Sequence, residues 1–366
     1  MVERRKTKQI HVGGVAIGGG AQISVQSMTK TYTHDVEATV RQIHQLENAG
    51  CDIVRVAVPD KASAEAVKPI ISKIRIPLIA DIHYDHRLAL LALEGGASCI
   101  RLNPGNLKDK ERVEQVIDAA KAHHVPIRIG VNAGSVDAVY PKEGPLRHEA
   151  RAAFIQKMID RGLDYLRFFE SRHFTNLKLS MKLSNVQDTV MVYRQMAKVC
   201  EYPFHLGVTE AGLPRDGSIK SALGIGALLL EGIGDTLRVS LTGDPVEEIE
   251  VGRRILQFLE LREYGPELIA CPSCGRADID LIQLVQAAEK RLGEMGKHQS
   301  EFVGLKIALM GCEVNGPGEA KDADIGIAAG KGQGMIFKKG QMVRRVKENE
   351  MVDALVQEML SLKEKS

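Results

Sequence analysis

Short apolar runs alternate with amphipathic stretches along the first two thirds of the chain. The apolar runs, many of them rich in β-branched residues, are 23–28, 52–58, 77–82, 99–103, 126–132, 177–182, 204–209 and 236–241. The stretches with helical spacing are 36–49, 61–73, 85–94, 109–123, 148–161, 185–200 and 220–230. Continuous apolar runs are typical of strands buried in a parallel sheet, and eight of them with interposed helices in about 250 residues suit a TIM-type barrel. The pattern therefore predicts an α/β fold with a (β/α)8 barrel.

The pattern changes after a helix predicted over 246–263. Tyr264, Gly265 and Pro266 interrupt it, so we expect a barrel over 1–264 and a second domain over 265–366. The second domain has helical patterns at 280–292 and 350–362, and strand patterns at 306–310, 324–328, 334–338 and 341–346. This mixture predicts a small α+β domain. The glycine-rich opening, 12–20, is interpreted as a hairpin that closes the bottom of the barrel.

Composition excludes several classes of function. The 366 residues include 49 Lys plus Arg and 47 Asp plus Glu, a net charge of +2, which argues against a general nucleic-acid-binding protein. Aromatic residues make up only 4% and Trp is absent, so a base-stacking surface is not expected. No apolar run reaches the ~18 residues of a membrane helix, and the charged opening lacks the apolar core of a signal peptide. We therefore expect a cytoplasmic protein without membrane or nucleic-acid partners.

Charged residues interrupt the apolar runs near their C-terminal ends, where a barrel of this kind carries its active site. A charge buried in a strand is costly unless it is paired, and the acids visible there are few, mainly Asp81 and Glu210. An anionic ligand, phosphate or diphosphate, explains the cations best because arginine grips phosphate oxygens with two N–H groups. Salt bridges to acids on the helices are the alternative. The candidate substrate-binding residues are Arg55, Arg101, Arg128, Asn132, Lys182, Arg238 and Ser240.

Two carboxylates at this end are candidate catalytic groups. Glu210 is the better candidate for a general acid, because a carboxylic acid near cations can deliver a proton. Asp81 is equally suited to positioning the cations. The histidines in or near these runs, His83, His173 and His205, are more often hydrogen-bonded core residues than catalysts.

The six cysteines fall into two groups. Cys51, Cys99 and Cys200 stand singly in apolar surroundings, where cysteine acts as a small hydrophobe. The others form a C-x-x-C pair followed by a third cysteine: Cys271, Cys274 and Cys312. Three thiolates suit zinc or an iron–sulfur cluster, and a redox dithiol also remains open. A structural zinc site is usually closed by four protein ligands, so the spacing of three cysteines favours a [4Fe–4S] cluster.

A fourth ligand for the cluster is available near Cys312. Gly316, Pro317 and Gly318 form a turn signal that can fold Glu319 back towards that cysteine. Glu319 is therefore a candidate metal ligand and a candidate catalytic residue.

These motifs together resemble the 4-hydroxy-3-methylbut-2-enyl diphosphate synthase family in its bacterial two-domain form. The resemblance covers nearly the whole chain and departs from the family at Glu313, where an apolar residue is usual. The motifs that carry it are Cys-Pro-Ser-Cys-Gly-Arg ending at Arg276, Asn-Gly-Pro-Gly-Glu ending at Glu319, Ala-Asp-Ile-His ending at His83, Arg-Leu-Asn-Pro-Gly-Asn ending at Asn106, Arg-Ile-Gly-Val-Asn ending at Asn132, and Gly-Val-Thr-Glu-Ala-Gly ending at Gly212.

The resemblance implies an oxidoreductase of the non-mevalonate route to isoprenoids. Its substrate would be 2-C-methyl-D-erythritol 2,4-cyclodiphosphate, opened and dehydroxylated by two electrons from flavodoxin or ferredoxin. It also implies a cluster held by the three cysteines and Glu319, and binding of the diphosphate by the barrel cations. Finally, it implies a homodimer with sites formed across chains. A separate argument supports the last point, because the final helix of a barrel returns the chain to the end opposite the mouth.

Two other interpretations stay open at this stage. A dihydropteroate-synthase-like barrel also binds a diphosphate at its mouth, without electron transfer. An iron–sulfur sensor would need a partner-binding surface, for which the sequence offers one basic run. That run is more typical of a solvated strand face or a docking site for an acidic electron carrier; it comprises Lys338, Lys339, Arg344, Arg345 and Lys347.

Overall fold

The computed structural model describes residues 2–107, 109–136, 147–295, 301–312, 323–330 and 332–363. The chain divides into two compact units, Met1–Arg262 and Glu263–Ser366. Each unit is described by itself.

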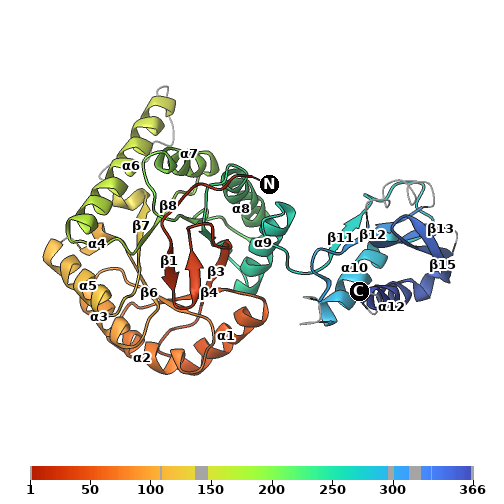
Figure 1. Cartoon of the computed structure of the whole chain (residues 1–366), viewed down its shortest axis with the longest axis horizontal. Helices are drawn as coiled ribbons and strands as arrows, with labels where there is room; N and C mark the ends of the chain where they lie inside the picture. The colour runs from red at the N-terminus through yellow and green to blue at the C-terminus, as the bar shows by residue number, and fades with distance from the viewer. Residues whose placement is uncertain are drawn as a thin grey trace. The chain divides into compact units, whose positions relative to one another are not determined.

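A closed barrel of parallel strands forms the first unit, inside a ring of helices (Figure 1). The sheet order within the described residues is β8-β7-β6-β5-β4-β3-β10-β9, and a parallel bridge between Leu179 and Phe204 joins its two ends. The barrel strands are β3 (Ser24–Met28), β4 (Ile53–Ala57), β5 (Leu78–Asp81), β6 (Cys99–Leu102), β7 (Ile127–Asn132), β8 (Leu177–Lys182), β9 (His205–Leu206) and β10 (Thr236–Leu237). The predicted TIM-type barrel is confirmed.

The helices of the barrel begin where the sequence supplies a cap. In α1, α2, α3 and α5 an aspartate precedes the helix and its carboxylate accepts a hydrogen bond from a backbone N–H in the first turn. The helices are α1 (Val36–Asn48), α2 (Lys61–Ile71), α3 (His86–Glu94), α4 (Pro104–Leu107), α5 (Lys110–Ala122), α6 (Arg147–Ser171), α7 (Val186–Ala197), α8 (Pro214–Leu229) and α9 (Pro245–Phe258). Each cap fixes the point at which the chain turns back along the barrel.

Three helices differ from the sequence pattern by five residues or more, among them α9, which ends at Phe258 rather than at 263. Helix α8 begins at Pro214, six residues before the predicted start at 220, because proline suits the first position of a helix, which needs no N–H donor. Helix α6 extends to Ser171, well past the predicted end at 161. The short helix α4 was not predicted.

The predicted hairpin lies at the bottom of the barrel, where the strands begin. Strand β1 (Ile10–Val12) pairs antiparallel with β2 (Val15–Ile17). Their apolar side chains form one buried cluster with Ile53, Ile79 and Cys99, near the N-terminal ends of β4, β5 and β6. This apolar plug leaves the other end of the barrel as the open end.

A five-stranded sheet forms the second unit, with helices α10 (Leu281–Glu294) and α12 (Met351–Lys363) packed on one face. The strands are β11 (Glu267–Ala270), β12 (Lys306–Met310), β13 (Ile325–Gly330), β14 (Gln333–Lys338) and β15 (Gln341–Lys347), in that spatial order among the described residues. Strands β11, β12 and β13 are parallel, and β14 and β15 continue the sheet antiparallel. Strand β11, which was not predicted, leads directly into Cys271.

In the described part of the chain, no helix is both long enough and apolar enough to cross a membrane.

Candidate active site

Three predicted charged residues lie side by side on neighbouring barrel strands. The parallel register pairs Asp81 on β5 with Arg101 on β6, and Arg101 with Arg128 on β7. Gly130, further along β7, makes this arrangement possible: a Cβ there would lie 2.8 Å from Nε of Arg101. The sheet register therefore gathers these groups near the open end.

Asp81 is the counter-ion of this group. Its carboxylate lies 3.0 Å from Nη1 of Arg101 and 3.6 Å from Nε of Arg55, and His83 approaches it to 3.6 Å. Burial alone would raise the pKa of Asp81, but Arg55, His83 and Arg101 together hold that pKa well below its usual range. Asp81 is thus an anion that orients two guanidinium groups.

Arg238 has a counter-ion that the sequence did not reveal. Glu248 of α9 is fully buried, and its carboxylate lies 3.1 Å from Nε of Arg238 and 3.6 Å from Nζ of Lys30. The expectation that the acids here are mainly Asp81 and Glu210 is therefore wrong, and the alternative of helix acids is correct for Arg238. Met28 also enters the group, with its sulfur 3.0 Å from Nη2 of Arg55 and 3.5 Å from Nη1 of Arg238.

Among the described residues, no carboxylate forms an ion pair with Arg128 or Lys182. Arg128 is only 1% exposed, and its Nε and Nη1 atoms have no hydrogen-bond partner among the described residues. Burial and the neighbouring Arg101 lower the pKa of Arg128 to about 10, so it stays charged at neutral pH. Burial and Arg128 also lower the pKa of Lys182 well below its usual value. Of the cations predicted at the mouth, these two are the ones that most need an anion.

The remaining predicted residues lie at the same end of the barrel. Asn132 ends β7 and is exposed, and Ser240 follows β10 and is half-buried. Glu210 follows β9, is exposed, and has a φ of 53°, a left-handed conformation that is strained for a non-glycine residue. The topology brings these residues to the mouth of the barrel.

Part of the barrel interior below the cations is unexpectedly polar. Val25 and Leu237 face outwards, since both lie close to Gly252 of α9; their neighbours along the strands therefore face inwards. The inward side chains are buried and carry polar atoms without partners among the described residues: Ser24, Gln26, Lys178, His205 and Thr236. In most TIM barrels bulky branched residues fill these positions.

Lys178 is the most costly member of this polar set. Burial lowers the pKa of Lys178 from 10.5 to about 8. Below pH 8 the amine is charged in both the folded and the unfolded chain, so folding bears the full cost of burying it. Between pH 8 and 10.5 the unfolded chain binds the extra proton, and stability rises with pH.

We therefore expect Lys178→Met to raise the free energy of unfolding by about 3 kcal/mol at pH 7 and by less than about 1 kcal/mol at pH 10. Denaturant unfolding at both pH values measures this difference. Lys157→Met, on the exposed face of α6, is the control and should change neither value. An equal change at both pH values would show that the pKa of Lys178 is not lowered in the folded chain. A loss of stability would show that an anion pairs with Lys178.

Cysteines 271 and 312 meet because β11 and β12 are adjacent parallel strands. Cys271 directly follows β11 and Cys312 lies two residues after β12, so both leave the same edge of the sheet. The backbone N–H of Cys271 donates to the carbonyl of Leu309, and that of Asp278 donates to the carbonyl of Gly311. These bonds fasten the segment containing Cys274 beside Cys312.

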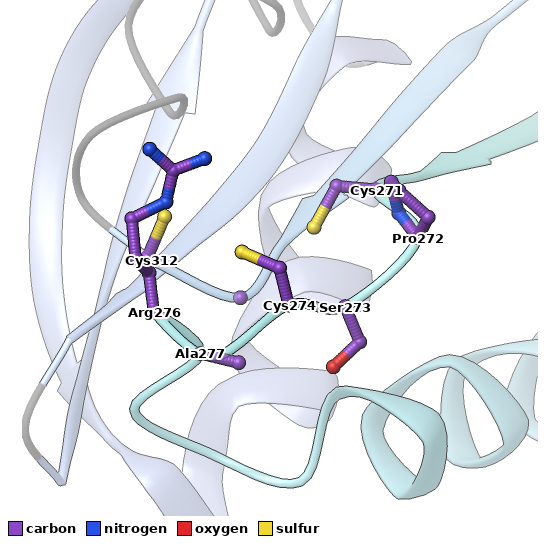
Figure 2. Close-up of a pocket in the computed structure, with 8 residues that line it drawn as sticks. Cys271, Pro272, Ser273, Cys274, Arg276, Ala277 and Cys312 are labelled. Carbon is purple, nitrogen blue, oxygen red and sulfur yellow. The ribbon is translucent and has the colours of Figure 1, made fainter.

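The three cysteines line one cavity of about 150 Å³ (Figure 2). Figure 2 shows the sulfur atoms of Cys271 and Cys274 directed into it. Hydrogen bonds from the backbone and side chain of Arg276 lower the pKa of the Cys274 thiol. The thiolate is the form that binds metal, so Arg276 prepares Cys274 for ligation.

This donor set fits an iron–sulfur cluster. In the described part of the chain, no three His, Cys, Asp or Glu side chains converge closely enough to hold a single metal ion. Three soft thiolates are the donors that an iron–sulfur cluster takes. Glu319 and Glu313 lie outside the described residues, so the fourth ligand stays a prediction.

Two family models match the chain in succession. The GcpE TIM-barrel domain matches residues 7–253, and the GcpE protein C-terminal domain matches residues 267–361.

Two relatives are similar to the chain over nearly its whole length. A 4-hydroxy-3-methylbut-2-en-1-yl diphosphate synthase (flavodoxin) from Clostridium perfringens is 50% identical over 356 residues, covering 97% of this chain and 98% of its own. One of the same name from Lawsonia intracellularis is 54% identical over 344 residues, covering 94% and 92%. Among solved structures, dihydropteroate synthase from Stenotrophomonas maltophilia matches with a TM-score of 0.48 at 16% identity, covering 69% of this chain and 98% of that one. On the two family models and these relatives, the chain belongs to the GcpE family.

Proposed function

We propose that the chain reduces 2-C-methyl-D-erythritol 2,4-cyclodiphosphate to 4-hydroxy-3-methylbut-2-enyl diphosphate, in non-mevalonate isoprenoid biosynthesis. The names of the relatives support this reaction. The structural observation that carries it is the buried Arg128 guanidinium, which has partnerless N–H groups at the mouth of a cationic barrel. A diphosphate supplies the charge and the acceptors that this group lacks.

The barrel residues divide into two sets on this proposal. Arg128 and Lys182 bind the diphosphate directly, since the described residues offer them no counter-ion. Arg55 and Arg101, held by Asp81, and Arg238, held by Glu248, present their remaining N–H groups in fixed directions. Asn132 and Ser240 add uncharged hydrogen bonds to the substrate. This division supports a site that is rigid before the substrate arrives.

The reaction consumes two electrons and one proton: the ring C–O bond to the diphosphate breaks, and a hydroxyl leaves as water. Glu210 is the proposed proton donor, because it follows β9 at the mouth and is exposed to solvent that can reprotonate it. Asp81 is unsuited to this role, because its lowered pKa keeps it ionised. Its proposed role is to position Arg55 and Arg101.

The electrons require a redox group, which we place in the second unit. Cys271, Cys274 and Cys312, with Glu319, are the proposed ligands of a [4Fe–4S] cluster. When bound, the cluster would supply the two electrons one at a time. The names of the relatives support flavodoxin as the donor, with ferredoxin as the alternative. A reducing cytoplasm is the compartment that keeps three such thiols reduced.

Anaerobic purification and assay test the proposed function. The protein should be brown and should bind iron and sulfide. With reduced flavodoxin or dithionite it should convert the cyclodiphosphate to an open diphosphate, which mass spectrometry detects. A colourless protein that binds a diphosphate without reducing it would support a dihydropteroate-synthase-like activity instead. A cluster without turnover would support a sensor.

We further propose that the protein is a homodimer with each site formed across two chains. After α9 the chain is fixed at the bottom of the barrel, where Arg262 pairs with Asp52 at 2.6 Å and donates to the carbonyl of Ile23 at 3.2 Å. Both partners precede the starts of barrel strands. The chain thus leaves the barrel opposite the mouth, which supports completion of that mouth by the cluster of a partner chain.

Mixing two inactive variants tests this assembly. One chain carries Arg101→Ala with Arg128→Ala, and the other carries Cys271→Ser. In a mixed dimer an intact barrel meets an intact cluster from the other chain, so up to about half of the sites recover. Purified heterodimers without activity would show that each site forms within one chain.

A further inference from the structure

Cys271 lies between two cavities. It lines the cavity of the three cysteines, and it also lines a second cavity of about 390 Å³. We call this second cavity the Ile282 groove. Its other lining residues come from the end of β11, the loop that follows Cys271 and the first turns of α10, among them Ala270, Ile282, Val285 and Gln286.

The walls of the Ile282 groove are apolar and accessible. Helix α10 buries Leu281, Leu284 and Ala288 against the sheet, while Ile282 on its outer face is 64% exposed. Ala270 at the end of the neighbouring strand β11 is also exposed, and β11 is an edge strand of the sheet. No charged side chain is among the residues that line the groove. Exposed apolar surface of this kind marks a site of interaction with another molecule.

We propose that the Ile282 groove is the docking site of the electron donor flavodoxin, and that electrons enter the second unit through Cys271. This proposal rests on the proposed function. Cys271 is the only cysteine that lines both cavities in the described part of the chain, since Cys274 and Cys312 line the first alone. Pro272 and Ser273 also line both cavities, so a flavin presented to the groove lies beside the segment that carries this proposed cluster ligand.

The chemistry of the groove distinguishes this donor from the substrate. A diphosphate needs cations, which the groove lining lacks, whereas the large planar flavin ring is mainly apolar. Each encounter removes one electron from the reduced flavin and transfers no atom. Two encounters then supply the two electrons consumed by one ring opening, while the proton comes from the barrel mouth.

Ile282→Asp tests the proposal, because it places a charge at the centre of the groove on an exposed helix position. We expect the Kd for flavodoxin, measured by titration calorimetry on the cluster-loaded protein, to rise at least tenfold. The KM for flavodoxin should rise in parallel. Iron content and the turnover driven by dithionite, which needs no docking site, should stay unchanged.

Met342→Asp is the matched control. Met342 is 60% exposed on β15, at the opposite edge of the same sheet and within the basic run at 338–347. Its substitution should leave the Kd for flavodoxin unchanged, and a higher Kd in Met342→Asp alone would assign docking to the basic run instead. An unchanged Kd in Ile282→Asp, or an equal loss in both variants, would overturn the proposal. A lower dithionite-driven rate or an altered dimer in Ile282→Asp would assign the groove to contact between copies. Absence of turnover in the unmodified protein with both reductants would instead refute the proposed function.

Discussion

Cys312→Ser is expected to remove the iron–sulfur cluster and to reduce turnover to background, a loss of at least about a hundredfold. Cys312 is buried two residues after β12 and lines the three-cysteine cavity. A serine hydroxyl is a hard and weakly acidic ligand, so it replaces a thiolate poorly on iron. Iron and sulfide analysis, absorbance near 400 nm and anaerobic turnover measure the loss. Cys271→Ser and Cys274→Ser should behave in the same way.

Cys200→Ser is the control for this prediction. Cys200 is also buried, but it lies in the barrel unit and lines neither cavity of the second unit. Its substitution changes the same atom and should leave iron content and turnover intact. Full iron content in Cys312→Ser would remove Cys312 from the proposed ligand set. Equal iron loss in Cys200→Ser would mean that the assay reports folding rather than ligation.

The barrel could be predicted from the sequence because its strands are buried on both faces. Continuous apolar runs bounded by capping residues placed β8 at the bounds observed and β3, β4 and β6 to within one residue of them. The pattern was less accurate for β9 and β10, whose apolar runs continue beyond the two residues that pair in the sheet. Apolar composition reports burial, and it does not report where ladder hydrogen bonds end. Strand β11 was not predicted, because it is short and half exposed at a sheet edge.

The cations of the candidate site could be predicted, but their partners could not. A charge within an apolar strand is a visible anomaly, whereas Glu248 sits among other acidic residues on a helix and resembles a solvated position. Lys178 was missed for a related reason. Along β8 it alternates with Leu177 and Leu179, as in a strand with one face in solvent, yet the inside of a barrel buries both faces. The ion-pair partners and the burial of a side chain depend on the closed barrel rather than on any local sequence pattern.

Arg128→Met separates a binding role from a structural role, because the two roles predict opposite changes in stability. If Arg128 serves the substrate, the free protein buries a charge without a counter-ion, and its removal should leave the free energy of unfolding unchanged or raise it by about 1–3 kcal/mol. Methionine nearly preserves the volume, so no large cavity is left. If Arg128 were part of a structural ion pair, the same change would lower stability by about 3–5 kcal/mol.

Substrate binding should change in the opposite direction. Loss of a charge-assisted contact of about 1.5–3 kcal/mol raises the Kd for the cyclodiphosphate roughly 10- to 150-fold, while the cluster spectrum stays the same. Calorimetric titration and denaturant unfolding of one preparation measure both quantities. Arg167→Met, at a mostly exposed site on α6, is the control and should change neither. Weaker binding without loss of stability would identify Arg128 as a guanidinium kept unpaired for the diphosphate. Lower stability with unchanged binding would show that Arg128 has a structural role.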